Sequence, residues 1–262
     1  FYERSIKMML AGDERFAAIA NRLAVLYENG DAYQKQMKIY EELYAQEKSP
    51  KLRQQYALKA GLIGLDKLQN ENLASEWLQR ADLGGVDDID LRASMLLVDI
   101  DRKNKDLDSA LNRLKDLEKR FVPSNSNYFW QVPFRLGVLH QNRKEWGASR
   151  PYLEQVANQQ QDTELAKDAQ QMLRSVDSVI AKQELQNLLN NENWKQVSKF
   201  VSEQERLGNL PLTKEIFGIW VKAETKQENW SMVLELYGRL QSILPEEATK
   251  VDSLLAQGKA AE

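Results

Sequence analysis

The feature that most constrains the fold is a pair of short amphipathic segments joined by a polar break, most complete at residues 217–245. Apolar residues recur at three- and four-residue steps on both sides of the break at 226–229. This is the spacing of one buried face on each of two helices. Such a hairpin cannot bury its apolar stripe alone and needs similar neighbours stacked on it. The sequence therefore predicts an array of helical hairpins.

The same pattern recurs along the chain, with polar turns at 29–31, 69–72, 104–106, 143–145, 191–194 and 226–229. The residues just after these turns recur every 36–39 positions or so, except for a gap of about 48 between Trp146 and Trp194. Helical spacing continues through 163–190, which predicts one long helix or two helices there. Pro151 predicts either a kink or a helix that begins near Arg150. Residues 1–10 are expected to be the second helix of a hairpin, and 246–256 a terminal capping helix.

Composition supports an all-helical fold with a continuous core. The 262 residues are 42% hydrophobic and 29% charged, with only 12 Gly and 6 Pro, and Leu, Ala, Gln, Glu and Lys favour helix over strand. Small residues such as Gly61 and Gly64 would let helices approach closely. They do not form a phosphate loop, because the Lys-Ser/Thr ending and the preceding strand are missing.

Charge and cysteine content exclude several kinds of site. A net charge of −3 with mixed signs argues against a nucleic-acid surface, which needs clustered Lys and Arg. The absence of Cys removes disulfides, thiolate nucleophiles and Cys-ligated zinc. No stretch approaches the roughly 18 apolar residues of a membrane span.

The residues of two hairpins carry a family resemblance. The first order is Leu136-Gly137 then Trp146 and Leu153; the second is Leu97-Val98, Asp106-Leu107, Ala110, Leu114 and Pro123. The order of residues in both hairpins resembles the tetratricopeptide repeat. The resemblance extends over five or six units of the chain. The departures are Gln36 and Ser149, where the family usually has Ala, and His140 and Glu224, where it usually has an aromatic residue. The resemblance implies an all-α, right-handed α-solenoid of antiparallel helical hairpins. We expect an N-terminal part of hairpins at 1–162 and a C-terminal part at 163–262, and the alternative is one continuous solenoid.

Members of this family bind extended segments or helices of other proteins in a concave groove lined by the first helix of each hairpin. The resemblance therefore implies a non-enzymatic interaction scaffold. The groove positions it implies are Asn21, Tyr56, Lys59, Ile63, Lys67, Arg92, Met95, Asp99, Gln131, Phe134, Val138 and Gln141.

Two other functions stay open. One is self-assembly through the ends of the solenoid or through an exposed aromatic loop at Tyr128, Phe129 and Trp130, giving a homo-oligomer. The other is an all-helical hydrolase with paired carboxylates. Asp87, Asp88 and Asp90 are better explained as helix-capping residues after the Gly84-Gly85 terminator.

No catalytic, metal-binding or cofactor-binding set is predicted. His140, the one histidine, has no second His or Cys near it and is interpreted as structural. Trp146, Trp194 and Trp230 recur at one repeat position, which predicts packing between hairpins.

The predicted partner is a protein segment, with no nucleic acid and no direct membrane insertion. Because the chain begins at Phe1 rather than with Met, we expect that an upstream portion, such as a signal or an anchor, has been removed. A bacterial periplasmic scaffold fits these features, and a cytoplasmic one is the alternative.

Overall fold

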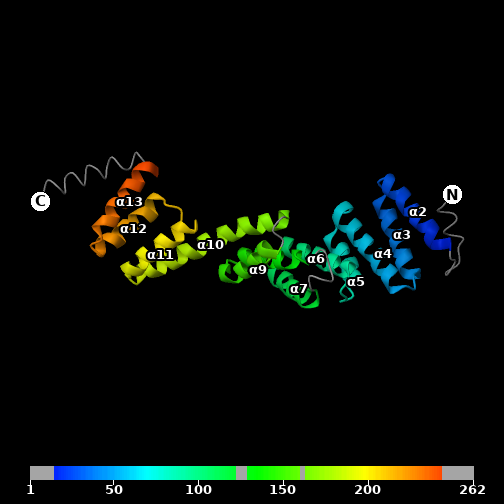
Figure 1. Cartoon of the computed structure of the whole chain (residues 1–262). Helices are drawn as coiled ribbons and strands as arrows, with labels where there is room; N and C mark the ends of the chain where they lie inside the picture. The colour runs from blue at the N-terminus through cyan, green and yellow to red at the C-terminus, as the bar shows by residue number, and fades with distance from the viewer. Residues whose placement is uncertain (1–14, 122–128, 160–162, 244–262) are drawn as a thin grey trace. The chain divides into compact units, whose positions relative to one another are not determined.

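The computed structural model describes residues 15–121, 129–159 and 163–243, which are helical throughout apart from short connections (Figure 1). These residues contain no strand. The chain divides by its contacts into two compact units, Phe1–Lys144 and Glu145–Glu262. The first contains α2 (Arg15–Asn29), α3 (Tyr33–Gln46), α4 (Pro50–Leu62), the π-helical turn η1 (Ile63–Lys67), α5 (Glu71–Ala81), α6 (Asp88–Lys103), α7 (Leu107–Arg120) and α8 (Gln131–Asn142). The second contains α9 (Trp146–Gln159), α10 (Glu164–Asn190), α11 (Trp194–Arg206), α12 (Lys214–Lys226) and α13 (Trp230–Ile243).

Within each unit, helices that follow one another in the chain pack against each other. In the N-terminal unit this holds for every step from α2 to α8, and in the C-terminal unit for every step from α9 to α13. The boundary expected at 162/163 separates α9 from α10, but these two helices pack together and belong to one unit. The all-helical architecture with sequential packing is confirmed, whereas the right-handed superhelix stays a prediction.

One type of turn occurs six times in the part of the chain that the structure describes. In each case a non-glycine residue has a positive φ: Asp31, Gln69, Lys105, Lys144, Glu192 and Glu228. Each lies in a polar turn that the sequence predicted, and the steps between them are 38, 36, 39, 48 and 36 residues. A left-handed residue after a helix turns the chain back and satisfies its last carbonyls. The Asn229 N–H, for example, donates to the Glu224 carbonyl at 3.0 Å.

The same turns also start the second helix of each pair. The side chains of Asn70, Asp106 and Asn193 follow the positive-φ residue directly and accept hydrogen bonds from Leu73 N, Ser109 N and Gln196 N. These are N-caps, which satisfy amide groups that a helix start leaves unpaired. The polar break in the sequence therefore ends one helix and begins the next within four residues.

The long step of 48 residues is explained by α10, a single helix of 27 residues. Of the two predicted alternatives for 163–190, one long helix is correct. Pro151 lies inside α9, which already begins at Trp146, so the predicted start near Arg150 is wrong.

Glycines allow the close approach of α4 and η1 to α5. A Cβ on Gly61 would lie 2.8 Å from Leu78 Cγ, and one on Gly64 would lie 3.1 Å from the Cα of Ala74. Because the second contact is with backbone, a side chain at Gly64 would separate the two helices. The predicted packing role of both glycines is confirmed.

The four residues that depart from the tetratricopeptide pattern, Gln36, His140, Ser149 and Glu224, are all buried. These four positions are therefore interior, although their side chains are polar. Buried polar groups need partners. Glu224 accepts hydrogen bonds from Trp220 Nε1 at 3.1 Å, from Asn229 Nδ2 at 2.8 Å and from Ser198 Oγ.

Three sequence predictions lie outside the described residues: the helix at 1–10, the capping helix at 246–256 and the side chain of Tyr128. None of the helices in the described part of the chain combines the length and apolarity needed to cross a membrane.

Candidate functional site

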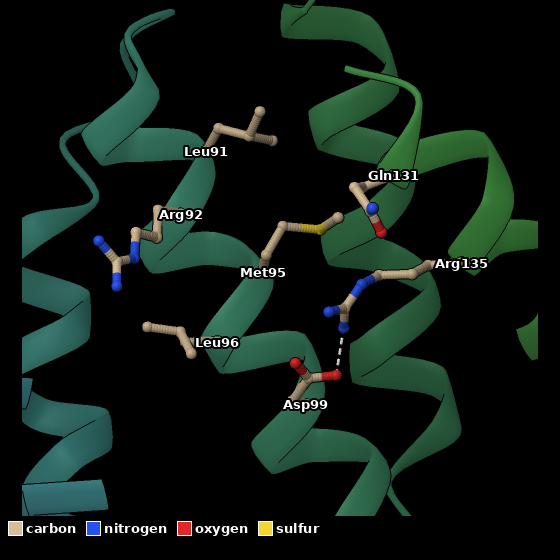
Figure 2. A pocket seen from close by; sticks show the side chains of 7 residues that line it. All are labelled: Leu91, Arg92, Met95, Leu96, Asp99, Gln131 and Arg135. Atoms are coloured by element: carbon tan, nitrogen blue, oxygen red, sulfur yellow. Dashed lines mark hydrogen bonds and ion pairs between the residues drawn. The ribbon is translucent and has the colours of Figure 1, made fainter. Parts of the chain in front are cut away.

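A cavity of about 500 Å³ lies between α6 and α8 in the N-terminal unit (Figure 2). Both are first helices, meaning the helix that precedes the positive-φ turn. Its lining residues are Leu91, Arg92, Met95, Leu96, Asp99, Gln131 and Arg135. The α6 residues follow the three- and four-residue steps of one helix face, and Gln131 and Arg135 are one turn apart on α8.

An ion pair connects the two walls of this cavity. Arg135 Nη1 contacts Asp99 Oδ1, and Arg102 Nη1 lies 3.6 Å from the same oxygen. In Figure 2 the Arg135 side chain reaches across to Asp99, while the guanidinium of Arg92 points away from this pair. Among the described residues Arg92 makes no ion pair, and it is exposed. The site therefore offers one guanidinium whose charge is not neutralised within the described structure.

The rest of the lining is mostly apolar. Leu91 and Met95 are buried and Leu96 is half-buried, so they form an apolar base beside the polar Gln131. A preformed hollow that combines apolar surface with a few polar groups is suited to holding side chains of a ligand.

The predicted groove residues Arg92, Met95, Asp99 and Gln131 meet at this cavity. Phe134 does not line it and is half-buried. Arg135 lines it instead and was missed by the sequence reasoning. A signal was present, because Arg135 lies 36 residues after Asp99, which is one repeat step and brings opposite charges onto neighbouring first helices.

Other predicted groove residues take part in packing. Tyr56 and Ile63 are buried, which contradicts their assignment to an open groove. Asn21 Nδ2 donates to the Ala17 carbonyl at 2.8 Å and to Tyr56 Oη at 3.4 Å. The Lys59 ammonium lies 5.2 Å from the centre of the Tyr40 ring. The reason is that α4 packs against both α3 and α5, which buries the α4 face.

The remaining predicted groove positions do not line the cavity. Val138 and Gln141 are half-buried on α8 and do not line the cavity. Lys67 is exposed at the end of η1, where its ammonium lies 5.1 Å from the centre of the Tyr33 ring.

A second cavity, of about 270 Å³, lies between the first helices α10 and α12 of the C-terminal unit. It is lined by Lys182, Leu185, Gln186, Leu189, Pro211, Thr213, Glu215, Ile216 and Ile219. Counted back from the positive-φ residue of each turn, four lining positions coincide in the two cavities: Met95 with Lys182, Asp99 with Gln186, Gln131 with Glu215, and Arg135 with Ile219. Each unit thus has a hollow between consecutive first helices, and the four coinciding positions carry different side chains.

The acidic residues at the start of α6 are structural. Asp87 caps the helix by accepting from Ile89 N at 2.9 Å and Asp90 N at 3.0 Å, as the sequence predicted. Asp90 is 2% exposed and accepts from Leu83 N at 2.8 Å and Gln54 Nε2 at 3.1 Å. Asp90 therefore holds the loop before α6 against α4, a role that the capping interpretation did not include.

Asp90 gives the N-terminal unit a pH-dependent stability. Burial, with a smaller contribution from the neighbouring Asp87, raises the pKa of Asp90 above its ordinary value. The folded protein then binds the proton more tightly than the unfolded chain. The free energy of unfolding must therefore fall as pH rises from about 4, the ordinary aspartate pKa, through the raised pKa of the folded state. We expect the free energy of unfolding of the parent minus that of Asp90→Asn, measured by urea unfolding, to fall over this pH interval. A difference that rises or stays constant would contradict the raised pKa of Asp90.

The aromatic residues differ from the predictions at two places. Phe129 is 6% exposed and packs edge to face with Trp130 at a centroid distance of 5.2 Å, so it does not form an exposed aromatic loop. Trp130 is half-buried. Trp146 and Trp194 are half-buried, but Trp230 is 58% exposed, so the prediction that it packs between hairpins is wrong for the described structure. No following helix covers it there.

The described ranges show no catalytic arrangement of side chains. His140 is buried in α8, and the described residues contain no group of three His, Asp or Glu side chains that could hold a metal ion. The Asp99 and Asp101 carboxylates, whose spacing superficially resembles a calcium loop, are paired with Arg135 and Arg113.

The candidate functional surface is therefore a pair of hollows between consecutive first helices, with four lining positions at equivalent register. Neither the protein-family models nor the curated proteins contain a match to the chain. The tetratricopeptide resemblance accordingly rests on the residues and their spacing alone.

Proposed function

We propose that this protein is a non-enzymatic interaction scaffold that holds a segment of a partner protein between its first helices. One observation carries the proposal. Arg92, Met95 and Asp99, assigned to a binding groove by their repeat register, line one cavity together with Gln131 and Arg135 of the next first helix.

The cavity is preorganised for binding. The walls of the cavity are helices whose positions are set by close packing and by the ion pair between Asp99 and Arg135. Binding then costs little ordering of the receptor, and the free energy lost is mainly that of ordering the partner segment. Apolar side chains of the partner would contact Leu96 and Met95, and an acidic group would contact Arg92.

The recurrence of the hollow in the C-terminal unit supports a binding role over a packing defect. A defect need not recur at the same register, whereas a repeat protein that recognises segments presents equivalent positions with varied side chains. The varied positions are those that coincide between the two cavities, such as Arg135 and Ile219.

The test is selection of random peptides displayed on phage against the parent chain, followed by affinity measurement with Arg92→Glu. We expect the selected peptides to bind Arg92→Glu at least about tenfold more weakly, equivalent to about 1.4 kcal/mol. The matched control is Lys115→Glu, the same charge change at an exposed position on the second helix α7, and it should bind as the parent does. If the selected peptides bind the parent and Arg92→Glu with equal affinity, and the unfolding midpoints are unchanged, the assignment of the groove is wrong.

A further inference from the structure

A recurring contact links each second helix to the hairpin that follows. The first residue of the second helix is touched by a cationic side chain from the next first helix in three cases: Tyr33 by Lys67 at 5.1 Å from the ring centre, Glu71 by Lys103 in an ion pair, and Trp194 by Lys222 at 4.8 Å from the ring centre. Each contact lies within one unit. The repeat therefore places a covering helix over the start of every one of these second helices.

The contact at Trp194 shows what the covering helix does. α12 packs against α11, Lys222 lies over the Trp194 ring, and Gln227 Nε2 donates to the Trp194 carbonyl at 3.3 Å. A cation over an aromatic face is attractive, and more so for tryptophan than for the other rings. With this cover Trp194 is half-buried.

The second helix α13 has the same starting residue but no cover among the described residues. It begins with Trp230, and both Trp230 and Leu234, one turn later on the same face, are 58% exposed. On the other face, Val233, Leu236 and Leu240 are buried. A helix with an apolar face on each side is expected to be packed on both sides.

We infer that residues 246–256 of this chain dock on the Trp230–Leu234 face of α13, as α12 docks on α11. α13 ends at Ile243, and a connection of three residues, 47–49, is enough between α3 and α4, so the segment can reach this face. Ala248, Val251 and Leu255 recur at three- and four-residue steps, which gives an apolar stripe to set against α13. Pro245 followed by two glutamates is typical of a helix start.

The test is disulfide trapping in the full chain, which contains no natural cysteine. Leu234→Cys is combined in separate proteins with Val251→Cys and with Leu255→Cys. The matched control combines Leu234→Cys with Ser253→Cys, because in helical spacing position 253 is on the side opposite to the apolar stripe. A disulfide needs Cα atoms about 4.4–6.8 Å apart, so only a docked segment brings the pairs together efficiently.

We expect at least one of the two stripe pairs to form a disulfide within the chain under mild oxidation, at least about tenfold faster than the control pair. No cross-link, or equal rates for all three pairs, would overturn the inference. Cross-links between chains at low protein concentration would also overturn it, because they would assign the face to a second copy. Quenching of tryptophan fluorescence by acrylamide gives an independent readout. The fluorescence of Trp230, obtained by difference from Trp230→Phe, should be quenched more strongly in Val251→Asp. Unchanged quenching would count against docking.

Discussion

Replacing Glu224 by leucine is expected to lower the free energy of unfolding of the C-terminal unit by about 2–4 kcal/mol. Glu224 is 3% exposed and accepts from three donors on two helices and the following turn, namely Trp220, Ser198 and Asn229. Leucine removes every acceptor. The Trp220 N–H, in a fully buried ring, is then left without a partner and cannot reach water.

Glu224→Gln is the matched control. It keeps the side-chain length and an oxygen for the Trp220 and Ser198 donors, so we expect less than half of the loss caused by leucine. Urea unfolding followed by tryptophan fluorescence measures both. If the leucine variant were as stable as the parent, this polar cluster would not stabilise the unit, because apolar packing would compensate for the lost hydrogen bonds.

Replacing Arg120 by methionine is expected to destabilise the N-terminal unit by a similar amount, about 2–4 kcal/mol. Its guanidinium donates from Nη1 to Asp82 Oδ1 at 3.1 Å and to the Gly85 carbonyl at 3.2 Å, and from Nη2 to Ser94 Oγ at 3.2 Å. Its Nε lies 2.8 Å from Asp116 Oδ2 without hydrogen-bond geometry. Removing the cation leaves Asp82, a mostly buried carboxylate, without its charge partner.

This arginine also affects the candidate site. It joins α7 to the loop before α6 and to α6 itself, and α6 carries Arg92, Met95 and Asp99. We therefore expect Arg120→Met to weaken peptide binding in addition to lowering stability. Arg120→Lys keeps the charge but loses the forked geometry, so its stability and its affinity for peptide should lie between those of the parent and those of Arg120→Met. Full stability in Arg120→Met, measured by circular dichroism on heating, would show that the loop is held by other contacts.

Much of the local structure could be predicted from particular residues. Asp106 and Asn193 start helices because their side chains accept from the amide group three residues later, a local effect that needs no tertiary contact. The apolar steps on both sides of the break at 226–229, around Trp220 and Leu240, gave the correct buried faces, because a helix of 3.6 residues per turn fixes which positions share a side. Gln36 and Glu224, at positions where the tetratricopeptide resemblance implies Ala and an aromatic residue, are buried even though their chemistry is polar.

The candidate site was only partly predictable. Register alone assigned Arg92, Met95 and Asp99 to one surface, but it equally assigned Tyr56 and Ile63, which packing buries. The open hollow arises where α6 and α8 leave space between them, and Arg135 enters it because Asp99 attracts it from the neighbouring helix. Separation between helices depends on which side chains interdigitate, and the pattern of one helix does not contain this information.

The sequence by itself determined the helices, the six turns and the register of the repeat, because capping, left-handed turn residues and apolar spacing act within a few residues. Only the tertiary structure decided which repeat positions are open. Trp194 and Trp230 occupy the same position in the pattern, yet the first is half-buried under Lys222 and the second is largely exposed among the described residues. The two residues differ because α12 packs over Trp194, whereas no described helix packs over Trp230. The burial of a residue therefore depends on the neighbouring helix as much as on the residue itself.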